Sequence, residues 1–401
     1  MSAYILTQII LTPLYLRILG EEQFGLIMIL LGIINFTIFG VSWFSGGIVR
    51  VLGEYWSKEN FENFKKTLTL GKYVFTLYAS LISILILIIF FVFKYFEALN
   101  NIDSSTILLL ILYFLITYES ISERQAFLGA NWQALGNNIE FIKVFVFALL
   151  TIYFLPQYKN INIIFIALIA GAITQRLITG SYLRLKLDFR GWEKFNNSMK
   201  TDFNRFFSKE GLNYFYFGTL VLLLQLDVVI IGLIGGPVIA GKFVILWKIP
   251  EVLGLILAKI PSSLEPKIIH LDAKSEMSIY NRLFLKSKNL FILLCFITSV
   301  FYMLSGEYLV KLWVGNNAPN EDWMYYIAGV ALFFYSISRW PISFAFAQIK
   351  LKQLIKISLI ELIFKFIFTL ILFEHFSYLS PLIGMILIHT FYVAKSYQSI
   401  Q

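Results

Sequence analysis

Long apolar runs separated by short polar breaks cover nearly the whole chain. Many approach or exceed about 18 residues, which lets a helix cross a hydrocarbon core of roughly 30 Å. The run from Tyr78 to Phe93, YASLISILILIIFFVF, is continuous rather than alternating, which is not the pattern of a membrane β-barrel. We therefore predict an all-α integral membrane protein with about twelve transmembrane helices. The expected spans are 3–18, 24–49, 73–93, 105–123, 140–155, 162–183, 210–233, 239–258, 289–306, 325–349, 354–373 and 379–396.

Composition excludes an ordinary soluble domain. The 401 residues are 58% hydrophobic and 14% charged, with a mean hydropathy of +0.76, whereas soluble domains carry roughly 25% charged residues. The single cysteine, Cys295, lies in an apolar run, so we expect it to pack as a small apolar side chain. The first span has only 16 residues, and we expect the true N-terminus to lie upstream of Met1.

The distribution of Lys and Arg supports twelve spans and fixes their orientation. The linkers after the second, fourth, sixth, eighth and tenth spans, together with the C-terminal tail, hold 24 of these cations, with Lys72 counted in the loop after the second span. The linkers on the other side of the membrane hold five. Cytoplasmic loops are the basic ones, so both termini should be cytoplasmic. This topology explains the net charge of +9 without nucleic-acid binding, and anionic lipid headgroups are the expected partners of the basic loops.

The longest cytoplasmic linker divides the chain into two sets of six spans. We predict an N-terminal lobe over 1–183, a linker with a surface helix over 184–209, and a C-terminal lobe over 210–401. The segments RILGEEQFGLIMIL (17–30) and GLIGGPVIAGKFVIL (232–246) echo one another after the first span of each lobe. Six plus six spans in parallel repeat is a recurring transporter plan, with the site between the halves.

The opening segments resemble the start of polysaccharide-type exporters of the MOP superfamily. They are TPLYLRILGEEQFGLIMILLGI (12–33) and GGIVRVLGEYWSKEN (46–60). QLDVVIIGLIGGPVIAGKF (225–243) is similar to the family's seventh helix, and YLVKLWVG (308–315) to the loop after its ninth. Family members usually carry ten or more further residues before the first helix. The matching positions of the first turn are Arg17, Leu19, Gly20, Phe24 and Gly25.

This resemblance implies a MATE-like architecture of two pseudo-symmetric six-helix lobes that open alternately to the two sides of the membrane. It implies a flippase for undecaprenyl-diphosphate-linked oligosaccharides in the bacterial inner membrane, serving O-antigen or capsule assembly. A polysaccharide polymerase and a chain-length regulator would then be partners. No cofactor is expected.

Charges inside the predicted spans are the candidate substrate contacts, because charge within a bilayer is costly and marks a polar pathway. Arg339 lies about 16 Å from the cytoplasmic end of its span, counted at 1.5 Å per residue, and Lys248 and Lys365 have similar depth. Guanidinium and ammonium groups suit a diphosphate. The first capture of the headgroup is expected at Arg50, Arg124 and Arg176.

Carboxylates near these cations offer a competing structural interpretation. The candidate ion pairs are Glu361 with Lys365, Lys248 with Glu251, and Asp227 with Lys242. The same carboxylates, Asp227, Glu251 and Glu361, are candidates for coupling transport to H⁺ or Na⁺, because a buried carboxyl can exchange a proton at working pH. Pro250 and Pro341 should kink their helices.

Enzymatic functions find little support in the pattern. His270, His375 and His389 are scattered, and the sequence has neither a phosphate-binding glycine loop nor a cysteine metal motif. The long outer loops of a membrane polymerase or ligase are missing, which disfavours that alternative. A multidrug or cation antiporter of the same superfamily is the nearer alternative, and it should favour acidic residues in its cavity.

Overall fold

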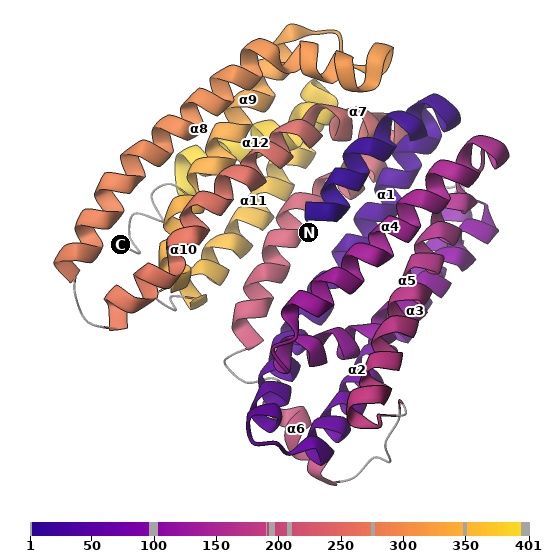
Figure 1. Cartoon of the computed structure of the whole chain (residues 1–401). Coiled ribbons are helices and arrows are strands. Elements are labelled where there is room, and N and C mark those ends of the chain that lie inside the picture. Colours follow the sequence, from indigo (N-terminus) through magenta and orange to yellow (C-terminus); the bar gives the residue numbers. More distant parts are fainter. Residues whose placement is uncertain are drawn as a thin grey trace. The chain divides into compact units, whose positions relative to one another are not determined.

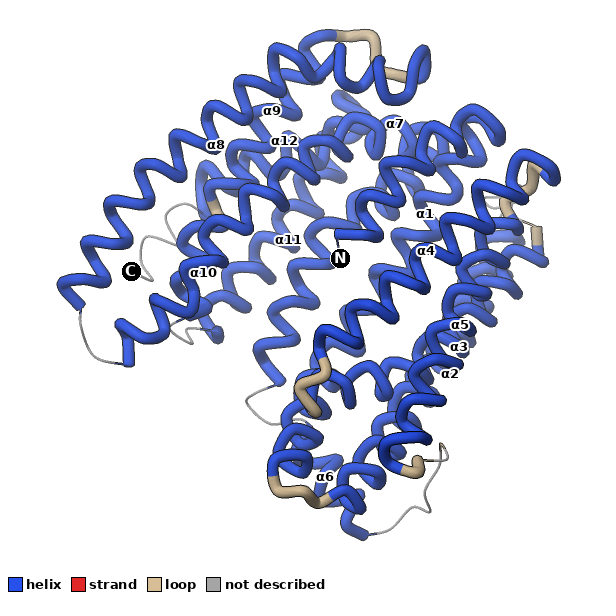
Figure 2. Tube along the Cα trace, viewed as in Figure 1, coloured by secondary structure: helices blue, strands red, loops and turns tan. Residues whose placement is uncertain are grey.

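The computed structural model describes residues 2–95, 103–189, 191, 197–206, 211–273, 277–347 and 351–393. All regular structure in these residues is helical (Figure 2), which confirms the predicted all-α class. The helices are α1 (Ser2–Ser57), α2 (Phe61–Tyr95), α3 (Ser104–Gly129), α4 (Gln133–Tyr158), α5 (Asn162–Leu187), α6 (Asn197–Phe206), α7 (Gly211–Ala273), α8 (Met277–Val314), α9 (Asp322–Ile337), α10 (Arg339–Ala347), α11 (Leu351–Phe376) and α12 (Ser380–Ile388). Short turns η1 (Gly315–Asn317), η2 (Ser377–Leu379) and η3 (His389–Val393) complete the set.

Every predicted span coincides with helix in the described chain. Two long helices, α1 and α7, each hold two predicted spans, and α9 with α10 holds the tenth. Among the described residues, eight segments are long and apolar enough to cross a membrane. The predicted span ends at 348–349 and 394–396 lie outside the described residues, as does Lys395 of the tail.

The chain packs into two compact units. Unit 1 comprises Met1–Leu19 and Thr37–Gly218, and unit 2 comprises Gly20–Phe36 and Thr219–Gln401. In unit 1, α3 packs against both α2 and α5, and α5 packs against α4. In unit 2, α9 packs against α8 and α12, and α12 packs against α11 (Figure 1). The short segment Gly20–Phe36 thus groups with the second half. The lobe boundaries predicted from the sequence placed this segment in the N-terminal lobe.

Two glycines interrupt α1 and α7 in the same way. Gly20 and Gly236 both have φ 82° and ψ 174°, a backbone region that glycine adopts without penalty. Five residues after each kink a second glycine follows, Gly25 and Gly241. A Cβ on Gly25 would lie 1.7 Å from the carbonyl oxygen of Pro237, and one on Gly241 would lie 3.4 Å from the Gly25 Cα. The two segments therefore touch backbone to backbone within unit 2, at matching positions of the repeat.

The helix predicted in the linker is α6, and a polar network holds it to unit 1. Asp202 is buried and accepts hydrogen bonds from Tyr55 (2.8 Å) and Thr67 (2.7 Å). Burial, together with the bond to Asp202, raises the pKa of Tyr55 to about 12. Arg205 of α6 forms an ion pair with Glu54. Residues 190, 192–196 and 207–209 of the predicted linker, and residue 210 at the start of the seventh predicted span, lie outside the described residues.

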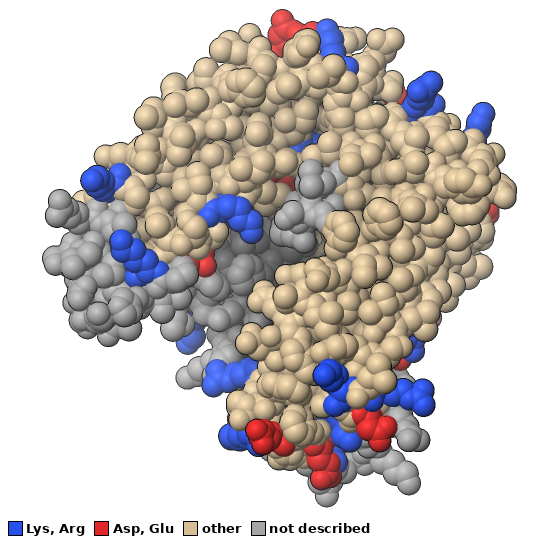
Figure 3. Space-filling model, viewed as in Figure 1, with Lys and Arg blue, Asp and Glu red and all other residues tan. Residues whose placement is uncertain are grey.

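Glu54 connects α6 to the end of α1. Its carboxylate accepts hydrogen bonds from Lys58 (2.8 Å) and from Arg205. These two cations hold the pKa of Glu54 below its ordinary value of 4.5. In Figure 3 charged side chains gather at this end of unit 1, whereas other residues cover its middle. This distribution is typical of helices whose middle lies in hydrocarbon.

Candidate functional site

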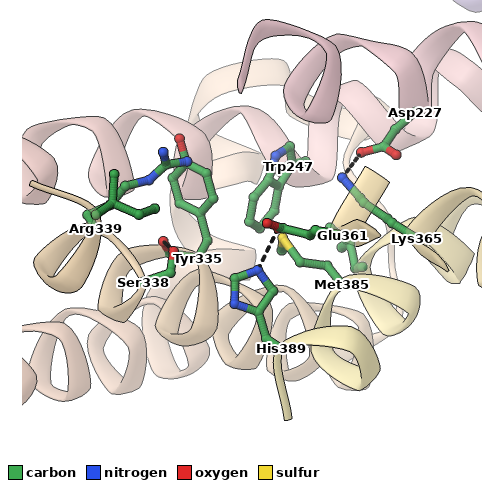
Figure 4. A pocket seen from close by; sticks show the side chains of 11 residues that line it. Asp227, Trp247, Tyr335, Ser338, Arg339, Glu361, Lys365, Met385 and His389 are labelled. Atoms are coloured by element: carbon green, nitrogen blue, oxygen red, sulfur yellow. Dashed lines mark hydrogen bonds and ion pairs between the residues drawn. The ribbon is translucent and has the colours of Figure 1, made fainter. Parts of the chain in front are cut away.

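Unit 2 contains a polar cavity among its helices. Its volume of about 20 Å³ is enough for a water molecule, which needs roughly 10–15 Å³. Acidic, basic and aromatic side chains from α7, α9, α10, α11 and η3 converge on it (Figure 4). The lining residues are Asp227, Trp247, Tyr335, Ser338, Arg339, Ile342, Glu361, Lys365, Leu382, Met385 and His389.

Lys365 of α11 forms a buried ion pair with Asp227 of α7. The Lys365 Nζ lies 2.6 Å from Asp227 Oδ2, and the two side chains are 8% and 7% exposed. The sequence interpretation paired these residues differently, Lys365 with Glu361 and Asp227 with Lys242. Neither expected pair is the close ion pair, because Lys365 reaches Asp227 in a distant part of the chain, although the charge of Lys365 still acts on Glu361.

Glu361 has a different partner, the ring of His389. The His389 Nε2 lies 2.9 Å from Glu361 Oε1, and both side chains are largely buried. In Figure 4 the ring and the carboxylate point toward one another and are joined by a dashed line. His389 begins η3, a π-helical turn at the end of α12, and such turns are frequent at functional sites. Sequence reasoning passed over this histidine because its partner is far away in the chain.

Arg339 reaches the same cavity from a break between two helices. α9 ends at Ile337 and α10 begins at Arg339, and the ring of Pro341 cannot donate the backbone bond that would continue the helix. The predicted kink is therefore present, slightly before Pro341, whereas α7 stays helical through Pro250. The guanidinium carbon of Arg339 lies 4.2 Å from the centre of the Tyr335 ring, a favourable cation–π distance.

Lys248 does not line this cavity. It is buried on α7 and donates a hydrogen bond to Glu251, with 3.1 Å between Nζ and Oε2. The predicted pairing of these two residues, one helical turn apart, is confirmed. Their charges cancel locally, so Lys248 and Glu251 form a neutral buried pair within the same helix.

The permanently charged and acidic side chains that line the cavity balance one another, apart from the ring of His389. Arg339 and Lys365 contribute two positive charges, and Asp227 and Glu361 contribute two negative ones. The lining is therefore neutral when His389 is neutral, and it carries one positive charge when the ring takes up a proton.

Unit 1 contains a second hollow, which we call the cationic groove. Its volume is about 720 Å³, and Phe189 and Gly191 at the start of the linker contribute to its lining. Lys72 lies in it and forms an ion pair with Glu123 at 2.5 Å, both side chains 4% exposed. The assignment of Lys72 to a loop was wrong, because α2 begins at Phe61 and already contains it. The lining residues are Lys72, Ile116, Glu123, Ile173, Arg176, Leu177, Gly180, Ser181, Arg184, Phe189 and Gly191.

The structure distributes the other candidate arginines over unit 1. Arg176 lies in the cationic groove and forms an ion pair with Glu119 at 2.7 Å, its side chain 42% exposed. Arg124 is half-exposed and lies 3.6 Å from Glu140. Arg50 is exposed near the end of α1. These three residues therefore do not share the cavity of unit 2 with Arg339 and Lys365.

Metal and cysteine chemistry find no support in the part of the chain that the structure describes. Within those residues no three His, Cys, Asp or Glu side chains come close enough to hold a metal ion. Cys295 is buried in an apolar cluster with Phe291 and Trp340, which confirms its predicted packing role.

Solved structures give the architecture a family context, although neither a family model nor a curated protein sequence matches the chain. A multidrug resistance MATE family transporter of the MOP superfamily, in an inward-facing conformation, is 12% identical with a TM-score of 0.72, over 100% of this chain and 94% of that one. A MOP superfamily transporter from Pyrococcus furiosus, described as having a binding pocket of reverse polarity, is 13% identical with a TM-score of 0.62, over 100% and 92%. A eukaryotic MATE transporter, AtDTX14, is 12% identical with a TM-score of 0.60, over 100% and 95%. The chain therefore has the fold of MATE transporters of the MOP superfamily, as the sequence predicted.

Proposed function

We propose that this protein is a flippase that moves undecaprenyl-diphosphate-linked oligosaccharides across the bacterial inner membrane by alternating access. It would serve the assembly of O-antigen, capsule or a similar surface polymer, with both termini cytoplasmic and without chemistry on the substrate. One observation carries the proposal: Arg339 and Lys365 line one polar cavity inside unit 2 of a MATE-like fold. Buried cations are costly in a membrane and are kept where an anion is handled.

In this proposal the diphosphate replaces a carboxylate as the partner of Lys365. The ion pair with Asp227 satisfies the ammonium while the site is empty, and Arg339 presents a fork of donors that suits phosphate oxygens. A cavity of about 20 Å³ is too small for the headgroup, so binding requires the helices around it to separate. The break at Ser338, between α9 and α10, is the natural place for this bending.

We further propose that a proton accompanies the substrate. Protonation of His389 would give the neutral cavity a positive charge, and an anionic headgroup would in turn favour that proton, because linkage between two bound species is reciprocal. Asp227 and Glu361 would take part as the carboxylates that contact Lys365 and His389. Glu251, also a candidate for ion coupling, would have the lesser role of neutralising Lys248. Na⁺ as the coupling ion is the alternative outcome.

Arg50 and Arg124 are proposed to make the first contact with the headgroup at the cytoplasmic side. Both are exposed or half-exposed in unit 1, and long-range attraction to an anion needs accessible charge. A polysaccharide polymerase and a chain-length regulator would act on the product after release. These partners rest on the proposed pathway alone.

A multidrug or cation antiporter is the second candidate function. The similar fold of a multidrug resistance MATE transporter and the carboxylates Asp227 and Glu361 in the cavity favour it. Both carboxylates already contact a basic group of the protein itself, at 2.6 Å and 2.9 Å. An organic cation would have to displace Lys365 or His389, whereas an anion can join them.

Proteoliposomes containing a fluorescent undecaprenyl-diphosphate oligosaccharide in one leaflet test the proposal directly. We expect Arg339→Gln to reduce flipping by about tenfold or more, the loss of one charged hydrogen bond of roughly 1.5–3 kcal/mol. Lys356→Gln, on an exposed position of α11, is the matched control and should flip normally. Normal flipping by Arg339→Gln would reject the headgroup contact, and ethidium efflux without any lipid flipping would favour the antiporter.

A further inference from the structure

The cationic groove of unit 1 combines a cationic surface with an apolar one, which suit the headgroup and the acyl chains of a phospholipid. On α5, Ile173 and Leu177 line it and are 41% and 65% exposed, as side chains facing hydrocarbon would be. Arg176 and Arg184 lie on the same helical face, eight residues apart, which separates them by about 12 Å along the axis. The groove therefore extends from a cationic helix end into an apolar flank.

The glycine between the two arginines keeps the groove open. Gly180 follows Arg176 by four residues and precedes Arg184 by four, so all three lie on one face of α5. A Cβ on Gly180 would meet nothing within 4 Å. No neighbouring helix packs so closely that it requires a glycine at this position. The missing side chain instead leaves room for a ligand between the two guanidinium groups.

The charge balance sets the class of ligand. Three cations, Lys72, Arg176 and Arg184, border the groove, and the carboxylates Glu119 and Glu123 each pair with one of them. The remaining charge of these groups is +1, which matches one phosphodiester. A diphosphate, with its higher charge, would exceed it.

We propose that the cationic groove binds a resident anionic phospholipid of the cytoplasmic leaflet, with its phosphodiester between Arg176 and Arg184 and its acyl chains along Ile173 and Leu177. Basic pockets between membrane helices on the cytoplasmic side are known to hold anionic headgroups. The groove volume of about 720 Å³ falls in the range of roughly 300–1,000 Å³ of small-molecule sites. In this proposal Arg176 binds a resident phospholipid and does not contact the transported substrate. The inference is independent of the proposed function, since any MATE-like transporter could hold such a lipid.

The test uses the full-length chain purified in mild detergent and native mass spectrometry to count bound lipids during titration with phosphatidylglycerol or phosphatidylcholine. We expect one phosphatidylglycerol to bind in preference to phosphatidylcholine. Arg184→Gln should weaken it about fivefold and Arg176→Gln/Arg184→Gln about 25-fold, at roughly 1 kcal/mol for each charge. Lys186→Gln is the matched control, because Lys186 is an exposed cation of the same helix end that does not line the groove.

A second variant separates a lost site from a lost fold. Gly180→Leu should keep or raise helix stability, since glycine is the poorer helix former by about 1 kcal/mol, yet it should abolish retention of phosphatidylglycerol. Unchanged retention in Gly180→Leu and in the double arginine variant would overturn the proposal. Displacement of the lipid by millimolar inorganic phosphate would show a headgroup site without a lipid requirement, and stronger retention of undecaprenyl diphosphate would make the groove a substrate site. Either result would also overturn it.

Discussion

The ion pair between Lys365 and Asp227 gives the sharpest quantitative prediction for unit 2. At 2.6 Å and an effective dielectric constant of 20, the attraction is about 6 kcal/mol, and desolvation of two buried charges offsets much of it. Removing either residue takes away the ion-pair partner of a charge that stays buried. We therefore expect Lys365→Met and Asp227→Leu each to lower the free energy of unfolding by about 3–5 kcal/mol.

The double variant should recover most of this loss, because it buries no charge. We expect Lys365→Met/Asp227→Leu to lie within about 1 kcal/mol of the parent protein, or above it. Unfolding in detergent micelles, followed by tryptophan fluorescence, measures the three variants as a double-mutant cycle. The exposed pair Lys311 and Glu307 on α8 is the matched control and should show no measurable coupling.

Transport by the same variants separates two roles of the pair. A purely structural pair predicts that the double variant, once its stability is restored, also transports again. If Lys365 contacts the headgroup, the double variant should be stable but inactive. Single variants that unfold like the parent protein would refute the reasoning, since they would show that neither charge depends on the other inside the folded unit.

Three further outcomes follow from the packing. Gly25→Val should prevent accumulation of folded protein in the membrane, because its Cβ would lie 1.7 Å from a carbonyl oxygen of α7. Gly180→Ala is the control and should be tolerated, because a Cβ there meets nothing within 4 Å. Fluorescence-detected gel filtration compares the amounts of folded protein of the two variants. Lys72→Met should destabilise unit 1 by about 3–5 kcal/mol by leaving a buried carboxylate, while Lys66→Met, in an exposed pair, should change its thermal unfolding little. Since the pKa of Glu54 is lowered in the folded protein from its ordinary 4.5, its contribution is fully present above that value and is lost as the pH falls through the lowered pKa. Cleavage of the α6 linker by an acid-tolerant protease should therefore rise on acidification through this range, and a cleavage rate that stays constant while Glu54 becomes protonated would contradict this.

The sequence allowed the helices to be predicted because a backbone in hydrocarbon must satisfy its own hydrogen bonds, which makes each long apolar run a helix. The boundary of α2 was harder. Its first two turns contain Lys65 and Lys66, so they read as a basic loop, and Lys72 was placed there too. The helix in fact continues beyond the apolar run, and it brings Lys72 to a carboxylate on α3 that periodicity alone does not indicate.

Charge partners were predictable only where they are neighbours in the sequence. Lys248 and Glu251 lie one turn apart on one helix and form the expected pair. Asp227 and Lys365 are 138 positions apart, and Glu361 with His389 depends on how α11 and α12 pack. Such pairs depend on tertiary packing. An isolated charge in a low-dielectric environment is costly, so it forms an ion pair with an opposite charge that packing brings close.

The placement of Gly20–Phe36 in unit 2 has a consequence for biosynthesis. The ribosome makes this segment among the first residues, but most of the surface against which it packs begins only at Thr219. During translation the segment therefore stays in the bilayer with its eventual neighbours still unmade, and the later half completes its packing only by capturing it. A nascent chain arrested before Thr219 should accordingly leave this helix open to chaperones and membrane proteases, however well its flanking helices have already assembled.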